Sequence, residues 1–248
     1  MLSRLFKKDA LIDEDIKNWI NEVFHWARGN FGENVFQQTQ LINPSNTHFP
    51  GRANSVEGMA EMIFDKVRQY AGMNHWPLFL VNEENVTQIP QTTLPKLQGP
   101  VRSFDTLLPV PVDDTNRLIV TYHPYQINDP EVLIASYAHT LAHYLGTTGT
   151  ELPPGGEEHW PHVTELLAVF LGFGIMMANT AHTNKIRSCG SCAGPVVERM
   201  NFLDEFQLTY ALAVFCQLKQ LSAKQVTPYL KKNLIPFYKK AVKDIQNT

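Results

Sequence analysis

Apolar residues recur at intervals of three and four near the start of the chain, as they do on one face of an amphipathic helix. This pattern predicts a helix over residues 12–31. Turn-forming residues follow, and a second helical pattern begins near Ser55 or Gly58 and ends at Gly72. The first part of the chain is therefore predicted to be mainly helical.

The middle of the chain, residues 77–128, has a different pattern. Residues 77–81 and 117–122 are short apolar runs bounded by polar turn residues, which is typical of strands. Five prolines from Pro90 to Pro111 argue against a long helix between them, because proline lacks the N–H that a helix interior needs. We expect a small sheet with irregular connections here.

Helical patterns return at Asp129. Asp129, Pro130 and an acidic residue after them are typical of a helix N-terminus, and Gly146 is expected to end this helix. After a polar loop, Pro161 opens an apolar helix that is predicted to end near Asn179.

The last part of the chain is predicted to form two helices, over about 199–220 and about 222–246. No internal repeat is visible, and no linker rich in glycine and serine divides the chain. We therefore predict a single α+β domain over residues 1–248, dominated by helices and with a small sheet.

Composition narrows the class of protein. Of 248 residues, 44% are hydrophobic and 18% are charged, which excludes a disordered or collagen-like chain. The net charge is −3 and no basic stretch extends beyond short pairs, so we expect no nucleic-acid partner.

The longest apolar run, Leu166 to Ala178, has 13 residues, fewer than the roughly 20 that span a bilayer, and predicts a buried core helix. Charged residues near the N-terminus interrupt any secretory apolar segment, and three cysteines are too few for a disulfide framework. We therefore expect a soluble, cytoplasmic protein that does not bind membranes.

His139 and His143 lie four residues apart in one predicted helix, so both imidazoles project from the same helical face. Glu165 follows His143 by 22 residues and heads an entirely apolar helix, where a carboxylate is costly unless a cation or several donors neutralise it. Two histidines and one carboxylate on consecutive helices can bind zinc, which we predict here. The alternatives are two ordinary histidines on a partly buried helix and a glutamate favoured by the helix dipole.

Residues 136–146, SYAHTLAHYLG, followed by residues 164–175, TELLAVFLGFGI, resemble the core of zincin-type proteins of the gluzincin kind. They are similar in particular to uncharacterised bacterial proteins in which AHELAH is followed by T-D/E-L-L-x-V-F-x-G-x-G. The segments that begin at His48 and at Tyr210 are also similar to that group.

This resemblance implies a zincin-like domain with a metal-site core over about 117–180 and C-terminal helices over about 199–246. It matches His139, His143 and Glu165 to the metal ligands. It also matches the strand predicted over 117–122 to the edge strand that borders a zincin cleft.

The sequence departs from the family at Thr140, where the family has the glutamate that takes a proton from the zinc-bound water. A threonine hydroxyl can hydrogen-bond that water but cannot act as its base near neutral pH. Glu157 and Glu158 are the nearest acids in the following loop and are the candidates for a substitute base, or else they are ordinary solvated residues.

Other polar residues suggest further chemistry. His162 lies three residues before Glu165 and is an alternative or additional ligand, or, like His159, a neighbour of the site or an exposed residue. Cys189 and Cys192 have the spacing of a metal clip or redox pair, which His182 could join, although a lone Cys-x-x-Cys is a weak signal. Cys216 is expected to pack as a small apolar residue.

Together these features predict a degenerate, metallopeptidase-like protein, a pseudoenzyme that binds zinc and a peptide or protein segment without efficient hydrolysis. One alternative is an active zinc hydrolase that uses Glu158 or Glu157 as base. The other is a metal-free interaction protein on the same scaffold. The sequence indicates no particular substrate or oligomeric state.

Overall fold

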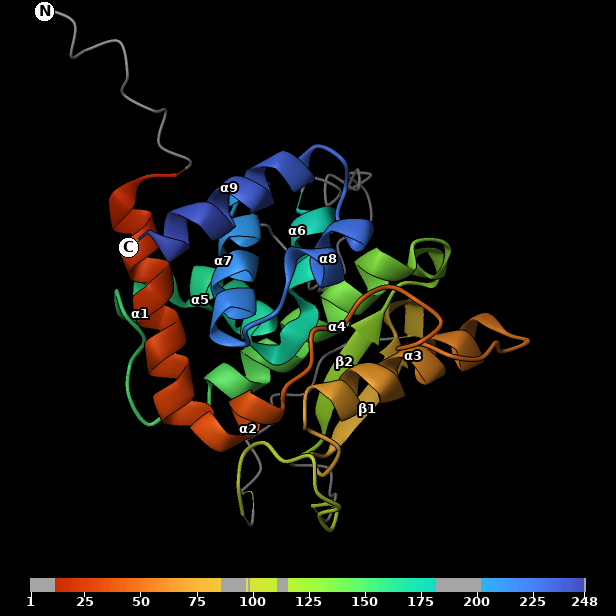
Figure 1. The fold of residues 1–248 in the computed structure, drawn as a ribbon. Coiled ribbons are helices and arrows are strands. Elements are labelled where there is room, and N and C mark those ends of the chain that lie inside the picture. The colour runs from red at the N-terminus through yellow and green to blue at the C-terminus, as the bar shows by residue number, and fades with distance from the viewer. Residues whose placement is uncertain (1–11, 86–96, 98, 111–115, 182–201, 248) are drawn as a thin grey trace, which may run out of the picture.

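The structure is a computed structural model that describes residues 12–85, 97, 99–110, 116–181 and 202–247 (Figure 1). Helices dominate it, and a two-stranded sheet accompanies them. The elements in chain order are α1 (Glu14–Phe31), α2 (Glu33–Gln38), α3 (Val56–Tyr70), β1 (Leu78–Asn82), β2 (Leu118–Tyr122), α4 (Pro130–Gly146), α5 (Trp160–Ala168), α6 (Gly174–Thr180), α7 (Glu205–Leu218), α8 (Ala223–Val226) and α9 (Leu234–Gln246).

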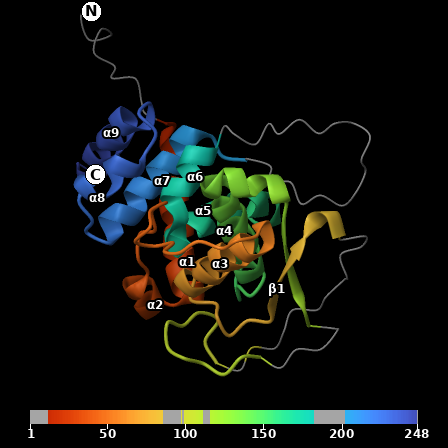
Figure 2. The ribbon, with the colours of Figure 1, turned by 90° about the vertical axis from the view of Figure 1, so that its right-hand side faces the viewer.

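Helix α4 lies at the centre of the fold. Helices α5 and α6 pack along one side of it, whereas α3 and β2 contact it from the other (Figures 1 and 2). Helix α7 packs on α6, and α1 and α9 lie outside α5 and α7, respectively. This arrangement confirms the predicted helix-dominated α+β domain with a small sheet.

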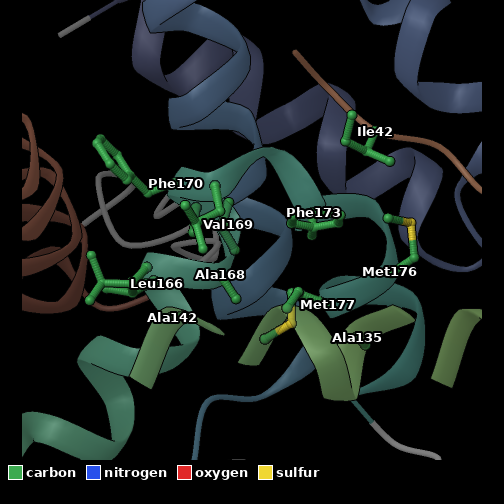
Figure 3. Close-up of a cluster of buried hydrophobic side chains, with 14 of the residues drawn as sticks. Ile42, Ala135, Ala142, Leu166, Ala168, Val169, Phe170, Phe173, Met176 and Met177 are labelled. Atoms are coloured by element: carbon green, nitrogen blue, oxygen red, sulfur yellow. The ribbon is translucent and has the colours of Figure 1, made fainter. Parts of the chain in front are cut away.

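The core is centred on the apolar stretch from α5 to α6. Figure 3 shows Ala142 of α4 near Leu166 and Ala135 of α4 near Met177, and all four side chains are buried. Alanine on the facing side lets α4 approach closely, so large side chains from the partner helices fill the space between them.

One helix in the described residues is long and apolar enough to cross a membrane by length and composition, and it runs from Glu157 to Thr180. The apolar stretch of this helix is entirely buried inside the protein. This burial is typical of the core helix of a soluble protein, as the 13-residue apolar run predicts.

The two strands pair in parallel, with Leu78 opposite Leu118. Their sequences match the predicted runs, and the side chains of Leu118, Val120 and Tyr122 point into the core. The backbone N–H of Leu118 donates to Pro77 O at 2.9 Å, on the side of β1. Because backbone groups alternate in direction along a strand, those of Ile119 point away from β1, to the outer edge of β2.

The apolar helix predicted from Pro161 to near Asn179 is present, but it is not a regular α-helix throughout. A π-helical segment, Val169–Phe173, separates α5 from α6, and Gly172 in it has φ of 99°. The backbone near residue 40 passes directly over this glycine: a Cβ atom there would lie 2.1 Å from Gln40 O. Gly172 O in turn accepts the backbone N–H of Ile42 at 2.9 Å. The break is therefore imposed by a segment distant in sequence.

The prediction of one helix over about 222–246 is wrong. The chain forms the short helix α8 and a 3-10 turn, Thr227–Tyr229, and α9 begins only at Leu234. Pro228 lies in that turn, where it has no N–H to continue the helix. The side chain of Asn179 then holds the break, because it donates to Tyr229 O at 2.8 Å and accepts from Lys231 N at 2.9 Å.

Candidate functional site

The two helices of the predicted metal site pack against each other, as the sequence predicts. Asp129 caps α4 by accepting the N–H of Val132, and a 3-10 turn, Glu157–His159, leads into α5. Gly146, the last residue of α4, lies against Trp160, the first residue of α5. A Cβ atom on Gly146 would be 2.9 Å from the Trp160 ring. Glycine thus lets the end of α4 approach the start of α5.

The residues of the histidine motif lie along the partly exposed face of α4. His139 and Thr140 are half-buried, and His143 is exposed. Although the His143 side chain reaches solvent, the protein atoms crowded around it lower its pKa below the ordinary value by desolvation. His143 is therefore neutral at neutral pH.

Thr140, at the position of the family's catalytic glutamate, bonds to its own helix. Its hydroxyl donates to Ser136 O at 3.1 Å. Such a bond to the preceding turn is common for threonine in helices. It leaves no acidic group at the position between the two histidines.

Glu165 is fully buried on α5. Its Oε2 accepts the backbone N–H of Leu203 at 2.8 Å, immediately before α7 begins. This carboxylate therefore ties the start of α7 to α5, and a charge-assisted bond of this kind offsets part of the cost of burying it.

The zinc ligands that the sequence predicts, His139, His143 and Glu165, lie on the neighbouring helices α4 and α5. Across the described ranges, no three His, Cys, Asp or Glu side chains come together in a way that could hold a metal ion. Glu165 already uses one oxygen to bond Leu203. The predicted zinc site stays a prediction.

The residues ahead of α5 form an aromatic cluster. The ring centroids of His159 and His162 lie 5.8 and 6.3 Å, respectively, from that of Trp19. The ring centroid of His162 also lies 5.4 Å from that of Phe202. Desolvation, with a smaller contribution from His159, lowers the pKa of His162. These histidines therefore contact α1 and the segment before α7.

Glu157 and Glu158, the candidate bases, are both exposed on the turn before α5. Cys189, Cys192 and His182 lie outside the described residues. Cys216 is a free thiol, buried in α7, which confirms its predicted packing as a small apolar residue, and burial raises its pKa to about 12.

The strand β2 borders α4. The Tyr144 hydroxyl, on α4, donates to Ile119 O at 2.7 Å, on the outer edge of β2. The backbone N–H and C=O of Thr121 point to the same edge, because Thr121 alternates with the residues that bond β1. An edge strand and the histidine-bearing face of α4 are thus neighbours.

The sequence did not predict the buried hydrogen bonds of two polar residues, Arg102 and Asn179. Arg102 is 1% exposed, and it donates to Ala71 O at 2.9 Å and to Thr39 Oγ1 at 3.0 Å. Asn179 lies at the end of the core helix and bonds to two other segments. A buried arginine in a proline-rich stretch carries no periodic signal, so only its tertiary contacts identify it.

Comparison with known protein families, with characterised proteins and with solved structures finds no match to the chain. The resemblance to zincins accordingly rests on residues 136–146 and 164–175 of the sequence.

Proposed function

We propose that this protein is a non-hydrolytic relative of zincin-type metallopeptidases that binds a peptide or protein segment. The observation that carries the proposal is the bond from Leu203 N–H to the buried carboxylate of Glu165. In this arrangement the predicted third ligand has a structural role, and the protein's function does not depend on zinc.

The absence of an acid at the base position supports the lack of hydrolysis. Thr140 bonds to Ser136 O and cannot take a proton from water near neutral pH. Glu157 and Glu158 are exposed to solvent on the turn before α5. A zinc-dependent reaction that uses one of these acids as its base would require that acid to move to the histidines.

The neighbourhood of β2 and α4 supports a peptide as the ligand. An extended segment that pairs with a sheet edge gains main-chain hydrogen bonds without needing a particular sequence. Thr121 offers its N–H and C=O at the outer edge of β2, beside the partly exposed face of α4. His139 and His143 on that face would then contact the side chains of the bound segment.

The first experiment measures zinc in the full chain purified without added metal, and its melting temperature with and without EDTA. We expect far less than one zinc per chain and no effect of EDTA. One zinc per chain, with a melting temperature lowered by EDTA and zinc lost in His143→Ala, would overturn the metal-free proposal. Peptidase activity lost in Glu158→Gln or Glu157→Gln would establish a hydrolase instead.

The second experiment tests the peptide site with a random peptide library displayed on phage. Thr121→Pro removes the N–H that points away from β1, so selected peptides should bind it much more weakly. Thr121→Val keeps that backbone group and should bind them as the natural chain does. Equal binding to both variants would place the peptide elsewhere.

We also infer a cytoplasmic location. The buried free thiol of Cys216 and the small number of cysteines support a reducing compartment. Fractionation of the native host cells, followed by immunoblotting, tests this location.

A further inference from the structure

A pocket with a volume of about 800 Å³ lies far in sequence from the histidine motif, in the range of sites for small organic ligands. One wall is the end of α2 and the segment after it, and the other is the end of α7 with α8 and the turn that follows. Six of the side chains that line it are amides: Gln37, Gln38, Gln40, Asn43, Gln220 and Gln225.

The charge of this pocket is opposite to that of the whole protein. The chain has a net charge of −3, yet Lys219 and Lys224 line the pocket and no aspartate or glutamate does. The carboxylate of Glu33 interacts electrostatically with Lys219, but it forms an ion pair with Arg28. The pocket therefore favours an anion over a cation.

A third cation, Arg102, lies directly behind the wall. The buried Arg102 donates from Nη2 to Thr39 Oγ1 at 3.0 Å, and Thr39 lines the pocket. The Nη1 atom of Arg102 is buried and has no hydrogen-bond partner. No salt bridge joins Arg102 to an acid within the described part of the chain. Its charge adds to the positive potential of the site.

The walls are held in place by hydrogen bonds between distant segments. Lys219 Nζ donates to Phe36 O at 2.9 Å and also to Gln37 O, which joins the end of α7 to the end of α2. Asn179 holds the opposite wall through Tyr229 O. A site fixed in advance loses less entropy when a ligand binds.

Gln220 has an unfavourable backbone conformation at the rim of the pocket. Its φ is 53°, and among the described residues it is the one non-glycine with positive φ. It follows α7 at the position where glycine usually ends a helix, and Leu221 N–H bonds back to Cys216 O at 2.8 Å. A glutamine here keeps an amide side chain in the pocket at a cost in strain, a combination that is frequent at functional sites.

We propose that this pocket binds a small hydroxylated organic anion, with the chemistry of a sugar phosphate or a sugar acid. The ammonium groups of Lys224 and Lys219 attract the anionic group. The amide side chains both donate and accept hydrogen bonds, so they match hydroxyl groups, which do the same. This site is separate from the proposed peptide site, and either can be wrong without the other.

The test measures binding to the full chain by isothermal titration calorimetry, with glucose 6-phosphate, glucuronate, glucose and inorganic phosphate as probes. We expect at least one of the two anionic sugars to bind, the stronger of them identifying the anionic group, and glucose to bind far more weakly. No binding by either anionic sugar would overturn the proposal. Equal affinity for phosphate and glucose 6-phosphate would overturn the role of the amides.

Two variants locate the site. Lys224→Gln should weaken binding of the anionic sugar roughly tenfold, as loss of one charge-assisted hydrogen bond does. Lys232→Gln, a matched change at an exposed lysine outside the pocket, should leave it unchanged. Equal affinities of the two variants would overturn the placement.

Gln220→Gly separates a binding role from a structural one. Glycine adopts positive φ readily, so this variant should melt at a higher temperature than the natural chain. It should nevertheless bind the anionic sugar several-fold more weakly, because the amide is lost. Unchanged affinity with the higher melting temperature would remove Gln220 from the site and overturn the argument from strain.

Discussion

Glu165 and Leu203 are 38 residues apart in sequence, yet the buried carboxylate accepts the backbone N–H at 2.8 Å. The bond fixes where α7 starts relative to α5. It thereby connects the two helices of the predicted metal site with the C-terminal part of the fold.

The first prediction concerns this bond. Glu165→Ala removes the acceptor and leaves the Leu203 N–H buried, so it should lower the free energy of unfolding by about 3 kcal/mol in urea denaturation. The exposed Glu158→Ala is the control and should change stability by less than about 0.5 kcal/mol. Similar effects of the two changes would contradict the structural role of Glu165.

The second prediction concerns Gly172. Alanine there would require a side chain at φ of 99° and place Cβ 2.1 Å from Gln40 O, so we expect a loss of more than about 3 kcal/mol of stability. Gly29 in α1 has no atom within 4 Å of its Cβ position, and Gly29→Ala should stabilise the protein by up to about 1 kcal/mol. Thermal or urea unfolding of both variants tests the pair.

The third prediction concerns the pH dependence of Cys216 reactivity. Burial raises the pKa of its thiol to about 12, so the folded protein holds the proton at pH 8 and keeps little of the reactive thiolate. Iodoacetamide should therefore label Cys216 very slowly at pH 8 and readily once urea unfolds the chain. Mass spectrometry of the peptide that contains Cys216 measures this, and rapid labelling of the folded protein would contradict it.

The fourth prediction concerns the contact between the first and last helices. Lys17 Nζ lies 2.7 Å from Asp244 Oδ2 and 3.0 Å from Glu14 Oε2, and the hydrogen bond to Asp244 is the largest cause of its raised pKa. Because Lys17 is largely buried, Asp244→Asn should cost about 2 kcal/mol of stability.

The exposed pair Arg68–Asp65 provides the control for this change. Asp65→Asn should have an effect of less than about 0.5 kcal/mol, as is usual for ion pairs at the surface. Equal losses in urea denaturation would mean that burial of Lys17 does not strengthen its contact with Asp244.

Local pattern was sufficient for much of the fold. The helices α1, α3 and α4 lie where apolar spacing predicts them. Asp129 caps α4 as the sequence predicts, and Ser55 caps α3, where the sequence leaves Ser55 and Gly58 open. The two strands also coincide with the predicted runs. These elements depend on interactions between residues at most a few positions apart, which a sequence displays directly.

Only part of the candidate site could be predicted from residues that are close together in the sequence. The spacing of His139 and His143 placed both on one helical face, and Glu165 was predicted on the helix that follows after a polar loop. The partner of Glu165 could not be predicted, because a buried carboxylate accepts whichever donor the tertiary structure brings to it, and Leu203 approaches from another helix.

The sequence by itself determined the class of fold, the histidine-bearing helix and the absence of an acid at Thr140. The tertiary structure alone decided the break at Gly172, the partner of Glu165 and the amide-rich pocket around Gln220. The physical reason is range: periodicity and capping act within a few residues, whereas a close backbone approach or a buried hydrogen bond joins segments whose separation leaves no pattern along the chain.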